Sequence, residues 1–379
     1  MTQEKIYWEE IGVNAELSEF VLNDGPAEIH AVLHIQPQED SFENQYNRLV
    51  AAQTLLAELP KMKGYQAVFK RYFLSDSTNQ RPLMNEDDNC AVTYIQQPPL
   101  DGSRIALWSY YIKGAEVKTK GNTTIVSHNG YQHLWQMDIK EIAGDSEMQT
   151  RNLLQRYESE LEQYGATIAD NCIRTWFFVR DVDTHYAGMV KARRENFAQQ
   201  GLTEATHYIA STGIGGGPSD TRAIVELGAY AMTGFEPYQQ RYLYASSHLN
   251  PTYEYGVTFE RGTCMEYGDR KHILISGTAS INNKGEVMHV GDIRKQTERM
   301  WENVEKLLEE AGTDFNDVMQ IVIYLRDIAD YEIVRKMFDK RFPLIPRVIT
   351  LAPVCRPTWL IEMECIAVAP CQNKKYRNF

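Results

Sequence analysis

The chain has few of the features that mark several common classes of protein. Its six cysteines are scattered without a CxxC pair, which suits reduced thiols better than a disulfide framework or a zinc site. No stretch approaches the roughly 20 consecutive apolar residues of a membrane span. The first residues show no basic segment followed by an apolar core, as a secretion signal would. We therefore expect a cytoplasmic protein with no membrane association, no metal and no organic cofactor.

Clustered positive charge is also scarce. The 39 Lys and Arg residues are outnumbered by 51 Asp and Glu residues, and the formal net charge is −12. A diffuse negative surface repels phosphate backbones, so the composition argues against nucleic acid as a partner. A small anionic substrate remains compatible, because two or three arginines focused in a cleft outweigh a diffuse surface charge.

What the sequence does contain is one pattern repeated three times. Residues 149–181 and 296–327 both run from a Gln-Thr pair through a helical pattern to an aromatic strand ending in Arg-Asp. A fainter copy runs over residues 45–76. Boundaries near residues 115 and 245 follow, and we expect three units at 1–115, 116–245 and 246–379.

Each copy mixes helix and strand patterns, which predicts an α/β (α+β) unit. In the third copy, apolar residues recur at helical spacing between Met300 and Ala311, and residues 321–325 are β-branched and aromatic. Gly312 is a predicted helix stop. A second helix is predicted near 331–342, followed by a long hairpin of 347–351 with 359–368. Matching hairpins are predicted at 91–112 and 207–232.

Such a unit is one sheet with two helices on one face, and its other face must be covered. We expect the three units to pack sheet to sheet around a pseudo-threefold axis, with the helices outside and clefts between the units. Because one chain supplies all three units around this axis, no further chain is needed to complete the arrangement, and a monomer is expected.

Three motifs of the third copy resemble the Rid (YjgF, endoribonuclease L-PSP) family: Ile275-Ser276-Gly277, Tyr324-Leu325-Arg326-Asp327 and Ile361-Glu362-Met363-Glu364-Cys365-Ile366-Ala367. The resemblance implies an active site with an arginine after a proline-containing turn and a glutamate fifteen residues later. Arg347 and Glu362 reproduce that interval.

A longer arrangement is similar to the chorismatases, which are Rid-related single-chain enzymes. It comprises residues 174–176, 208–215, 259–262 and 276–281. This resemblance implies three fused Rid-like (chorismate-mutase-like) units and an enzyme that removes pyruvate from chorismate. The product would be a cyclohexadiene diol acid, 3-hydroxybenzoate or 4-hydroxybenzoate, and the sequence leaves the choice open.

Glu362 is the expected general acid. Strand periodicity places Glu364 on the same face, and in an occluded site this proximity, with desolvation, favours a protonated carboxyl. The alternative is that Glu364 faces solvent. Candidates for the substrate carboxylates are, in order, Arg347, Arg261 and Arg174, although Arg174 is equally plausible as a structural cation stacked on aromatic rings. Further predicted substrate contacts are Ser276, Ala279, Cys355, Thr212 and Gly213.

Only the third copy carries both members of the Arg and Glu pair, which favours one active cleft over three. The second copy has Glu226 but His207 near the place of the arginine, and the first has Trp108 or Ser109 where the glutamate would be. Two other functions stay open: a Rid-type deaminase of 2-imino acids or enamines, and a non-catalytic protein that binds a small molecule in the same cleft.

Overall fold

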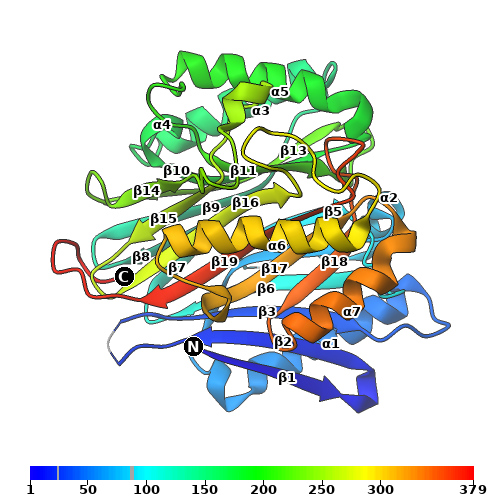
Figure 1. Cartoon of the computed structure of the whole chain (residues 1–379). Helices are drawn as coiled ribbons and strands as arrows, with labels where there is room; N and C mark the ends of the chain where they lie inside the picture. Colours follow the sequence, from blue (N-terminus) through cyan, green and yellow to red (C-terminus); the bar gives the residue numbers. More distant parts are fainter. Residues whose placement is uncertain (24, 86–88) are drawn as a thin grey trace.

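The computed structural model describes residues 1–23, 25–85 and 89–379. Its strands form three sheets that follow one another along the chain, with the longer helices on their outer faces (Figure 1). The predicted α/β architecture of three fused units is confirmed. The sheet changes lie between Lys113 and Glu116 and between Thr233 and Gln240. The third sheet thus begins a few residues before the expected boundary near 245.

The first sheet has the strand order β1-β2-β3-β6-β4-β5-β12. Its long helix begins at Phe42, and the side chain of the preceding Ser41 accepts a hydrogen bond from the backbone N–H of Asn44 and so caps the helix. The elements of this copy are β1 (Thr2–Trp8), β2 (Val13–Phe20), β3 (Ala27–Ile35), α1 (Phe42–Glu58), β4 (Gln66–Leu74), α2 (Ser77–Gln80), β5 (Ala91–Gln96) and β6 (Ile105–Lys113), with 3-10 turns at Glu9–Ile11, Pro60–Met62 and Arg81–Leu83. The predicted second helix is therefore reduced here to the single turn of α2.

The second sheet has the order β11-β10-β13-β9-β8-β7 and is covered by two long helices, shown in green in Figure 1. Its elements are β7 (Glu116–Lys120), β8 (Thr123–His128), β9 (Tyr131–Lys140), α3 (Ser146–Glu162), α4 (Ile168–Asn171), β10 (Cys172–Val179), α5 (Val182–Gln199), β11 (Ala210–Gly215), β12 (Gly217–Pro218) and β13 (Val225–Thr233). The short strand β12 leaves this unit and pairs with β5 of the first sheet.

The third sheet has the order β14-β15-β16-β19-β17-β18. Asp292 caps its long helix, and Gly312, with φ of 73°, follows the helix end as predicted. The elements are β14 (Gln240–Leu243), β15 (Gly262–Glu266), β16 (Arg270–Ala279), α6 (Ile293–Glu310), β17 (Val318–Leu325), α7 (Tyr331–Arg341), β18 (Arg347–Leu351) and β19 (Ile361–Pro370), with 3-10 turns at Thr252–Tyr255, Phe315–Asp317 and Ile328–Asp330.

The predicted closing hairpins are wrong in one respect. β18 and β19 do not pair with each other, because β17 lies between them, parallel to β18 and antiparallel to β19. The same insertion places β4 between β5 and β6, and β10 between β11 and β13. Alternation of apolar and polar residues indicates which face a strand buries, but not which strand is its neighbour.

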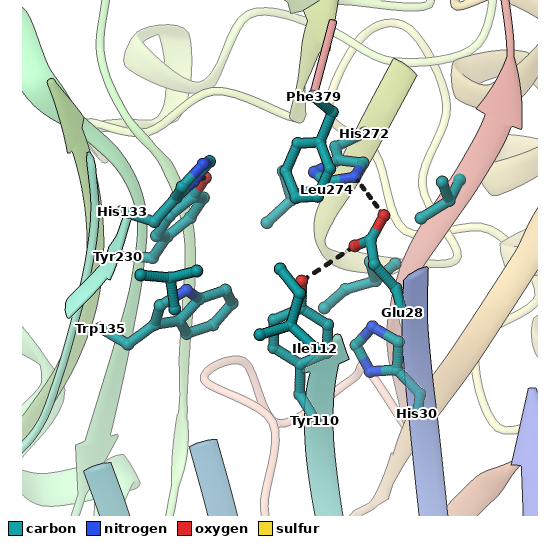
Figure 2. A pocket seen from close by; sticks show the side chains of 13 residues that line it. Glu28, His30, Tyr110, Ile112, His133, Trp135, Tyr230, His272, Leu274 and Phe379 are labelled. Atoms are coloured by element: carbon teal, nitrogen blue, oxygen red, sulfur yellow. Dashed lines mark hydrogen bonds and ion pairs between the residues drawn. The ribbon is translucent and has the colours of Figure 1, made fainter. Parts of the chain in front are cut away.

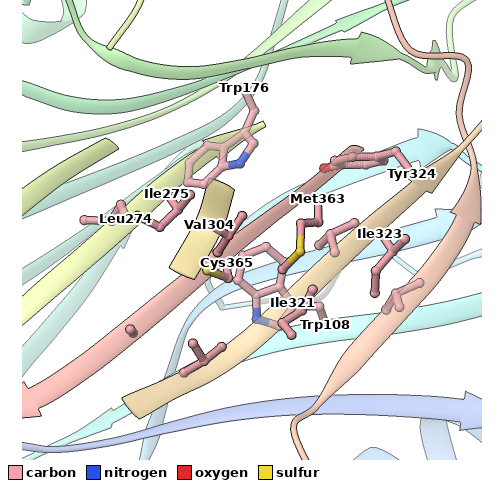
Figure 3. Close-up of a cluster of buried hydrophobic side chains, with 14 of the residues drawn as sticks. Trp108, Trp176, Leu274, Ile275, Val304, Ile321, Ile323, Tyr324, Met363 and Cys365 are labelled. Atoms are coloured by element: carbon pink, nitrogen blue, oxygen red, sulfur yellow. The ribbon is translucent and has the colours of Figure 1, made fainter. Parts of the chain in front are cut away.

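The inner faces of the three sheets pack on one another in a shared core. Trp108 of the first sheet, Trp176 of the second and Met363 of the third belong to one buried cluster (Figure 3). Backbone bridges also join the units, including Ile214 with Val354 and Pro99 with Thr350. None of the helices in the described residues is long and apolar enough to cross a membrane.

Candidate active site

The side chain of Glu362 lies in a cavity between the second and third units, which we call the Glu362 cavity. About 470 Å³ of space, including its mouth, lies among residues of α5 and β11, of the segment before β15, and of β16 and the loop before β19. These are Tyr186, Arg193, Ser211, Gly213, Tyr255, Val257, Phe259, Arg261, Gly277, Ala279, Ile281, Cys355, Arg356, Trp359 and Glu362. Both units are therefore needed to build it.

Glu362 is a buried carboxyl group that no described residue holds by a hydrogen bond. It is 4% exposed and sits on β19 opposite Ala279 of β16 and Tyr324 of β17. Burial, and next the charge of Glu364, raise the pKa of Glu362 to about 8, although Arg261 and Arg174 oppose this shift. Near neutral pH the group is therefore mostly a carboxylic acid that can donate a proton.

Glu364 is also buried. It therefore lies in the protein interior, as predicted for a residue on the same face as Glu362, and does not face solvent. Its carboxylate accepts hydrogen bonds from donors of the other two units: Arg71 Nη1 at 3.3 Å, Arg174 Nη2 at 2.8 Å, Trp176 Nε1 at 2.9 Å, and the hydroxyl of Thr212. Glu364 thus joins all three units. These donors also offset the cost of burying its negative charge, which would destabilise the fold if it were unpaired.

Two buried arginines give the Glu362 cavity its positive charge. Arg261 is 4% exposed and donates to the backbone and side-chain oxygens of Asn250, which are neutral acceptors. Arg193 is 1% exposed, and its Nε and Nη2 atoms have no hydrogen-bond partner among the described residues. Neither guanidinium group forms an ion pair within the described chain, so both remain available to an anion.

Arg193 was not predicted from the sequence. On α5 it lies four residues after Met189 and four before Phe197, and all three side chains are buried. A charged residue on the apolar stripe of a helix was the available signal. Arg356, at the mouth, was also missed; it is exposed and donates to the backbone oxygen of Tyr255 at 3.3 Å.

The remaining predicted contacts divide into two groups. Gly213, Ala279 and Cys355 line the Glu362 cavity, together with Arg261 and Glu362. Burial raises the pKa of Cys355 to about 12, so this group is a thiol forming part of the wall rather than a nucleophile.

Arg174, Thr212 and Ser276 lie outside this lining. Arg174 and Thr212 bind Glu364, and the hydroxyl of Ser276 donates to the backbone oxygen of Glu260 at 2.6 Å. The hydroxyl of Ser276 also accepts the backbone N–H of Ser211 at 2.9 Å, so it fastens the second unit to the third.

Gly277 makes room for the acid. A Cβ at this position would lie 2.0 Å from Oε1 of Glu362, closer than any real contact. The glycine-rich run 211–217 consists mostly of strand residues. It forms β11 and β12, and the backbone N–H of Gly215 donates to Pro353 O at 3.0 Å.

Comparisons with known proteins bear on the third unit and on the whole fold. The sequence model of the family described as Endoribonuclease L-PSP matches residues 266–369. A RutC family protein of Pyrococcus abyssi is 36% identical over 98 residues, which are 25% of this chain and 76% of that protein. The chain belongs to the Rid (RutC, endoribonuclease L-PSP) family.

Two further relatives extend the comparison. The 3-aminoacrylate deaminase RutC of Acinetobacter baylyi is 31% identical over 97 residues, covering 25% of this chain and 77% of that protein. A crystal structure of a chorismatase aligns with a TM-score of 0.63 and 17% identity, covering 79% of this chain and 92% of that chain. At this identity the likeness shows the fold: this Rid family member shares the chorismatase architecture.

The structure does not bring Arg347, the arginine implied by the Rid resemblance, to the Glu362 cavity. Arg347 Nη1 donates to the backbone oxygens of Phe342 at 2.6 Å and Ile345 at 3.2 Å, and Nη2 pairs with Asp339. It lines a different cavity, where the first and third units meet, together with Glu16 and His34. The two residues are separated by β17, so their interval along the chain does not place them in one site.

Of the other two units, the second has a glutamate at the position of Glu362 and the first does not. Tyr324, Phe178 and Phe73 occupy the same repeat position, and they pair with Glu362, Glu226 and Ala106 respectively. The first unit therefore has Ala106, rather than the predicted Trp108 or Ser109, in the place of the glutamate. Glu226 is fully buried, and its carboxyl oxygens have no hydrogen-bond partner among the described residues.

Within the described ranges, no group of His, Cys, Asp or Glu side chains is arranged to hold a metal ion. The ionisable groups that line the Glu362 cavity include the buried acid Glu362 and the guanidinium groups of Arg193, Arg261 and Arg356.

Proposed function

We propose that this chain is a chorismatase-type enzyme that removes pyruvate from chorismate, with Glu362 as general acid. The observation that supports the proposal most strongly is that Glu362 is buried in a cavity and is protonated near neutral pH. Burial raises its pKa to about 8, and it faces a cavity that also contains two buried arginines without a carboxylate partner in the described chain. An acid that stays protonated near neutral pH beside binding sites for anions suits the cleavage of an anionic enol ether.

The proposed reaction begins with proton transfer from Glu362 to the side-chain methylene carbon of chorismate. The electron pair of the enol C=C bond forms the new C–H bond, and the adjacent carbon becomes an oxocarbenium-like centre. Addition of water gives a hemiketal and releases a proton, which can restore the acid. Collapse of the hemiketal breaks the bond between the hemiketal carbon and the ether oxygen; the hemiketal hydroxyl loses its proton to form the ketone of pyruvate, and the ether oxygen takes a proton and stays on the ring, which gives the diol acid. Where the ring also loses water and aromatises, the co-product is a hydroxybenzoate.

The charges of the cavity match those of the substrate. Chorismate carries two carboxylates, and Arg193 and Arg261 provide two buried guanidinium groups from different units. Charge-assisted hydrogen bonds to the two carboxylates would fix the enol ether beside Glu362. Ala279 and Cys355, which flank the acid, are the nearest candidates for side chains that bias how the cation reacts.

A Rid-type deaminase of enamines or 2-imino acids is the second candidate. It is favoured by the likeness of the third unit to a RutC described as a 3-aminoacrylate deaminase. The position of Arg347 argues against it, because this arginine is bound to Asp339 and two backbone oxygens outside the Glu362 cavity.

The decisive test is incubation of the purified protein with chorismate. Pyruvate is followed by a coupled assay and the ring product by chromatography, for the wild type and for Glu362→Gln and Arg347→Met. We expect pyruvate from the wild type and from Arg347→Met, and at least a 100-fold lower rate from Glu362→Gln, because a positioned general acid contributes about 10²–10⁴-fold.

The same three proteins are assayed for ammonia release from 2-aminoacrylate generated in situ. Release by the wild type that is lost in Arg347→Met, without pyruvate from chorismate, would replace the first proposal by the second. Binding of chorismate without turnover by a folded wild type would instead indicate a binding protein.

A further inference from the structure

A second cavity lies between the second and third units, and we call it the Glu260 cavity. It is built by the loop before β11 and by the segment between β14 and β15. Its volume is about 180 Å³, within about 640 Å³ of space that includes its mouth, and a cavity of about 150 Å³ can hold a benzene ring. The lining residues are Glu204, Thr206, His207, Tyr208, Tyr244, Ser246, Leu249, Asn250, Pro251, Thr252, Tyr253, Glu260 and Arg261. Of these, only Arg261 also lines the Glu362 cavity.

Glu260 is a buried carboxyl group with one oxygen that no described residue binds. The side chain is 8% exposed, and its Oε1 accepts the backbone N–H of Tyr208 at 2.8 Å. No donor among the described residues reaches Oε2. Burial raises the pKa of Glu260, and the N–H of Tyr208 and the charges of His207 and Arg261 oppose this shift only in part. An ammonium group in contact with Oε2 would favour the charged carboxylate.

Glu28, which is buried where the three units meet, shows what Glu260 lacks. Its carboxylate accepts hydrogen bonds from His272 at 3.0 Å and from the Tyr110 hydroxyl at 2.9 Å (Figure 2), and Arg270 donates to it at 2.8 Å. The rings of Tyr110 and Trp135 are in contact beside it, with centroids 5.5 Å apart. The Glu28 cluster is thus complete without a ligand, whereas Glu260 lies beside open space and has no cation bonded to it within the described chain.

Arg261, the next residue along the chain, supplies the opposite charge. Its Nε and Nη2 donate to the backbone oxygen of Asn250 at 3.3 and 2.9 Å, and Nη2 also donates to Oδ1 of Asn250 at 3.2 Å. Nη1 has no acceptor among the described residues, and no ion pair joins Arg261 to Glu260 there. Two buried groups of opposite charge that line one cavity without pairing can each bind a charge of a ligand.

The other walls of the Glu260 cavity carry little charge. Tyr208 and Leu249 are buried, whereas Tyr244 and Tyr253 are exposed. Besides Glu260 and Arg261, the acidic and basic side chains of the lining are the exposed Glu204 and the half-buried His207. A ligand can therefore place an apolar group against Tyr208 and Leu249 while its charged groups reach Glu260 and Arg261.

We propose that the Glu260 cavity binds a free α-amino acid with an apolar side chain. The ammonium group donates to Oε2 of Glu260, the carboxylate accepts from Nη1 of Arg261, and the side chain packs against Tyr208 and Leu249. An acid without the ammonium group would leave Glu260 unpaired, and an amine without the carboxylate would lie next to the charge of Arg261. The site therefore selects a zwitterion, in contrast to the dianionic substrate proposed for the Glu362 cavity.

L-Phenylalanine is the probe, and calorimetric titration of the intact chain tests the site. 3-Phenylpropanoate lacks its ammonium group and 2-phenylethylamine lacks its carboxylate, whereas the ring and the chain are the same. We expect L-phenylalanine to bind about tenfold or more tightly than either, because each comparison compound loses one hydrogen bond between charged groups. Glu260→Gln should weaken the binding of L-phenylalanine by a similar factor and leave that of 3-phenylpropanoate unchanged.

Two neighbouring serines provide a matched pair of variants that locate the site. Ser246 and Ser247 are both exposed, but only Ser246 lines the Glu260 cavity. Ser246→Phe should obstruct the cavity and weaken the binding of L-phenylalanine about tenfold or more, whereas Ser247→Phe should bind it as the wild type does.

The proposal is overturned if L-phenylalanine does not bind the wild type, or if Ser246→Phe folds and binds it as tightly as Ser247→Phe does. Equal or tighter binding of 3-phenylpropanoate or 2-phenylethylamine by the wild type would overturn the zwitterion as the chemical class. These titrations need no catalytic activity, so their outcome is separate from that of the chorismate assay.

Arg261 lines both cavities, so a carboxylate on its Nη1 in the Glu260 cavity should compete with the substrate carboxylate. L-Phenylalanine should then raise the KM for chorismate and leave kcat unchanged, an expectation that rests on the proposed function. In an active wild type, binding of L-phenylalanine without a change in KM would overturn its contact with Arg261.

Discussion

Glu362 and Glu364 lie two residues apart on β19 and are both buried, but only Glu364 is hydrogen bonded to guanidinium groups. Arg71 and Arg174 compensate the charge of Glu364, whereas Glu362 faces a cavity and accepts no hydrogen bond from any described residue. The charge of Glu364 contributes to raising the pKa of Glu362. The strand β19 therefore carries both Glu364, whose carboxylate is hydrogen bonded to the other two units, and Glu362, whose carboxyl group is proposed as the general acid.

The pH dependence of kcat should reflect the protonated form of Glu362. Because its pKa is raised to about 8, the acid form predominates below that pH and is lost above it. We expect kcat for pyruvate release to be level on the acid side and to fall about tenfold per pH unit beyond about pH 8. Initial rates at saturating chorismate between pH 5 and 10 measure this. A kcat that rises through pH 8 would mean that the carboxylate, acting as a base, is the active form.

Arg193→Met should weaken substrate binding. A hydrogen bond to a charged group contributes about 1.5–3 kcal/mol, so the loss of one carboxylate contact should raise KM about 10- to 100-fold. Arg194→Met is the matched control, because Arg194 is the next residue on α5 and is exposed. The KM for chorismate of both variants is measured by steady-state kinetics and compared with that of the wild type. An equal KM for the two would remove Arg193 from the site.

Gly277→Ala should displace the acid without disrupting the fold. The added Cβ would lie 2.0 Å from Oε1 of Glu362, so the carboxyl group must move. A shift of about 1 Å in a catalytic group costs on the order of 100-fold in rate. Gly228→Ala is the control, since its Cβ would meet the flexible Met137 side chain away from this cavity. We expect thermal denaturation of the two variants to be similar while only Gly277→Ala loses kcat; full activity in Gly277→Ala would contradict the placement of Glu362.

The sequence was sufficient to predict the repeated architecture, whereas the role of Glu362 as the acid stays a prediction. The apolar spacing from Met300 to Ala311 and the run 321–325 correspond to α6 and β17, because both patterns report burial along a single element. Glu362 was selected because the Rid resemblance implies a glutamate fifteen residues after Arg347, and strand periodicity placed Glu364 on the same face.

The surroundings of the acid could not be predicted in the same way, because they depend on how elements meet. Arg347 precedes Glu362 by fifteen residues, but the insertion of β17 places it in another cavity. Arg193 comes from a helix of a different unit, and nothing in the spacing along the chain connects it to Glu362. The partners of Glu364 likewise belong to the other two units, so Arg174 could not be distinguished from a substrate-binding residue.

The two glutamates should respond oppositely to replacement by glutamine. Glu364→Gln leaves Arg71 and Arg174 buried without a countercharge, and breaking such a pair costs about 3–5 kcal/mol of unfolding free energy. Glu362→Gln should stabilise the protein at higher pH. The folded pKa of Glu362 is raised from 4.5 to about 8, so the wild type has its full stability below pH 4.5 and loses part of it as the pH rises to 8.

Between pH 4.5 and 8, the free energy of unfolding of the wild type should fall by about 1.4 kcal/mol per pH unit. Glu362→Gln should not show this fall. Urea denaturation of the wild type and both variants at pH 5 and pH 8 provides the comparison. Glu364→Gln should be less stable than the wild type at both values, whereas the advantage of Glu362→Gln should be larger at pH 8 than at pH 5. An advantage that does not grow with pH would mean that Glu362 is already ionised in the folded protein, and the general-acid role would then have no basis.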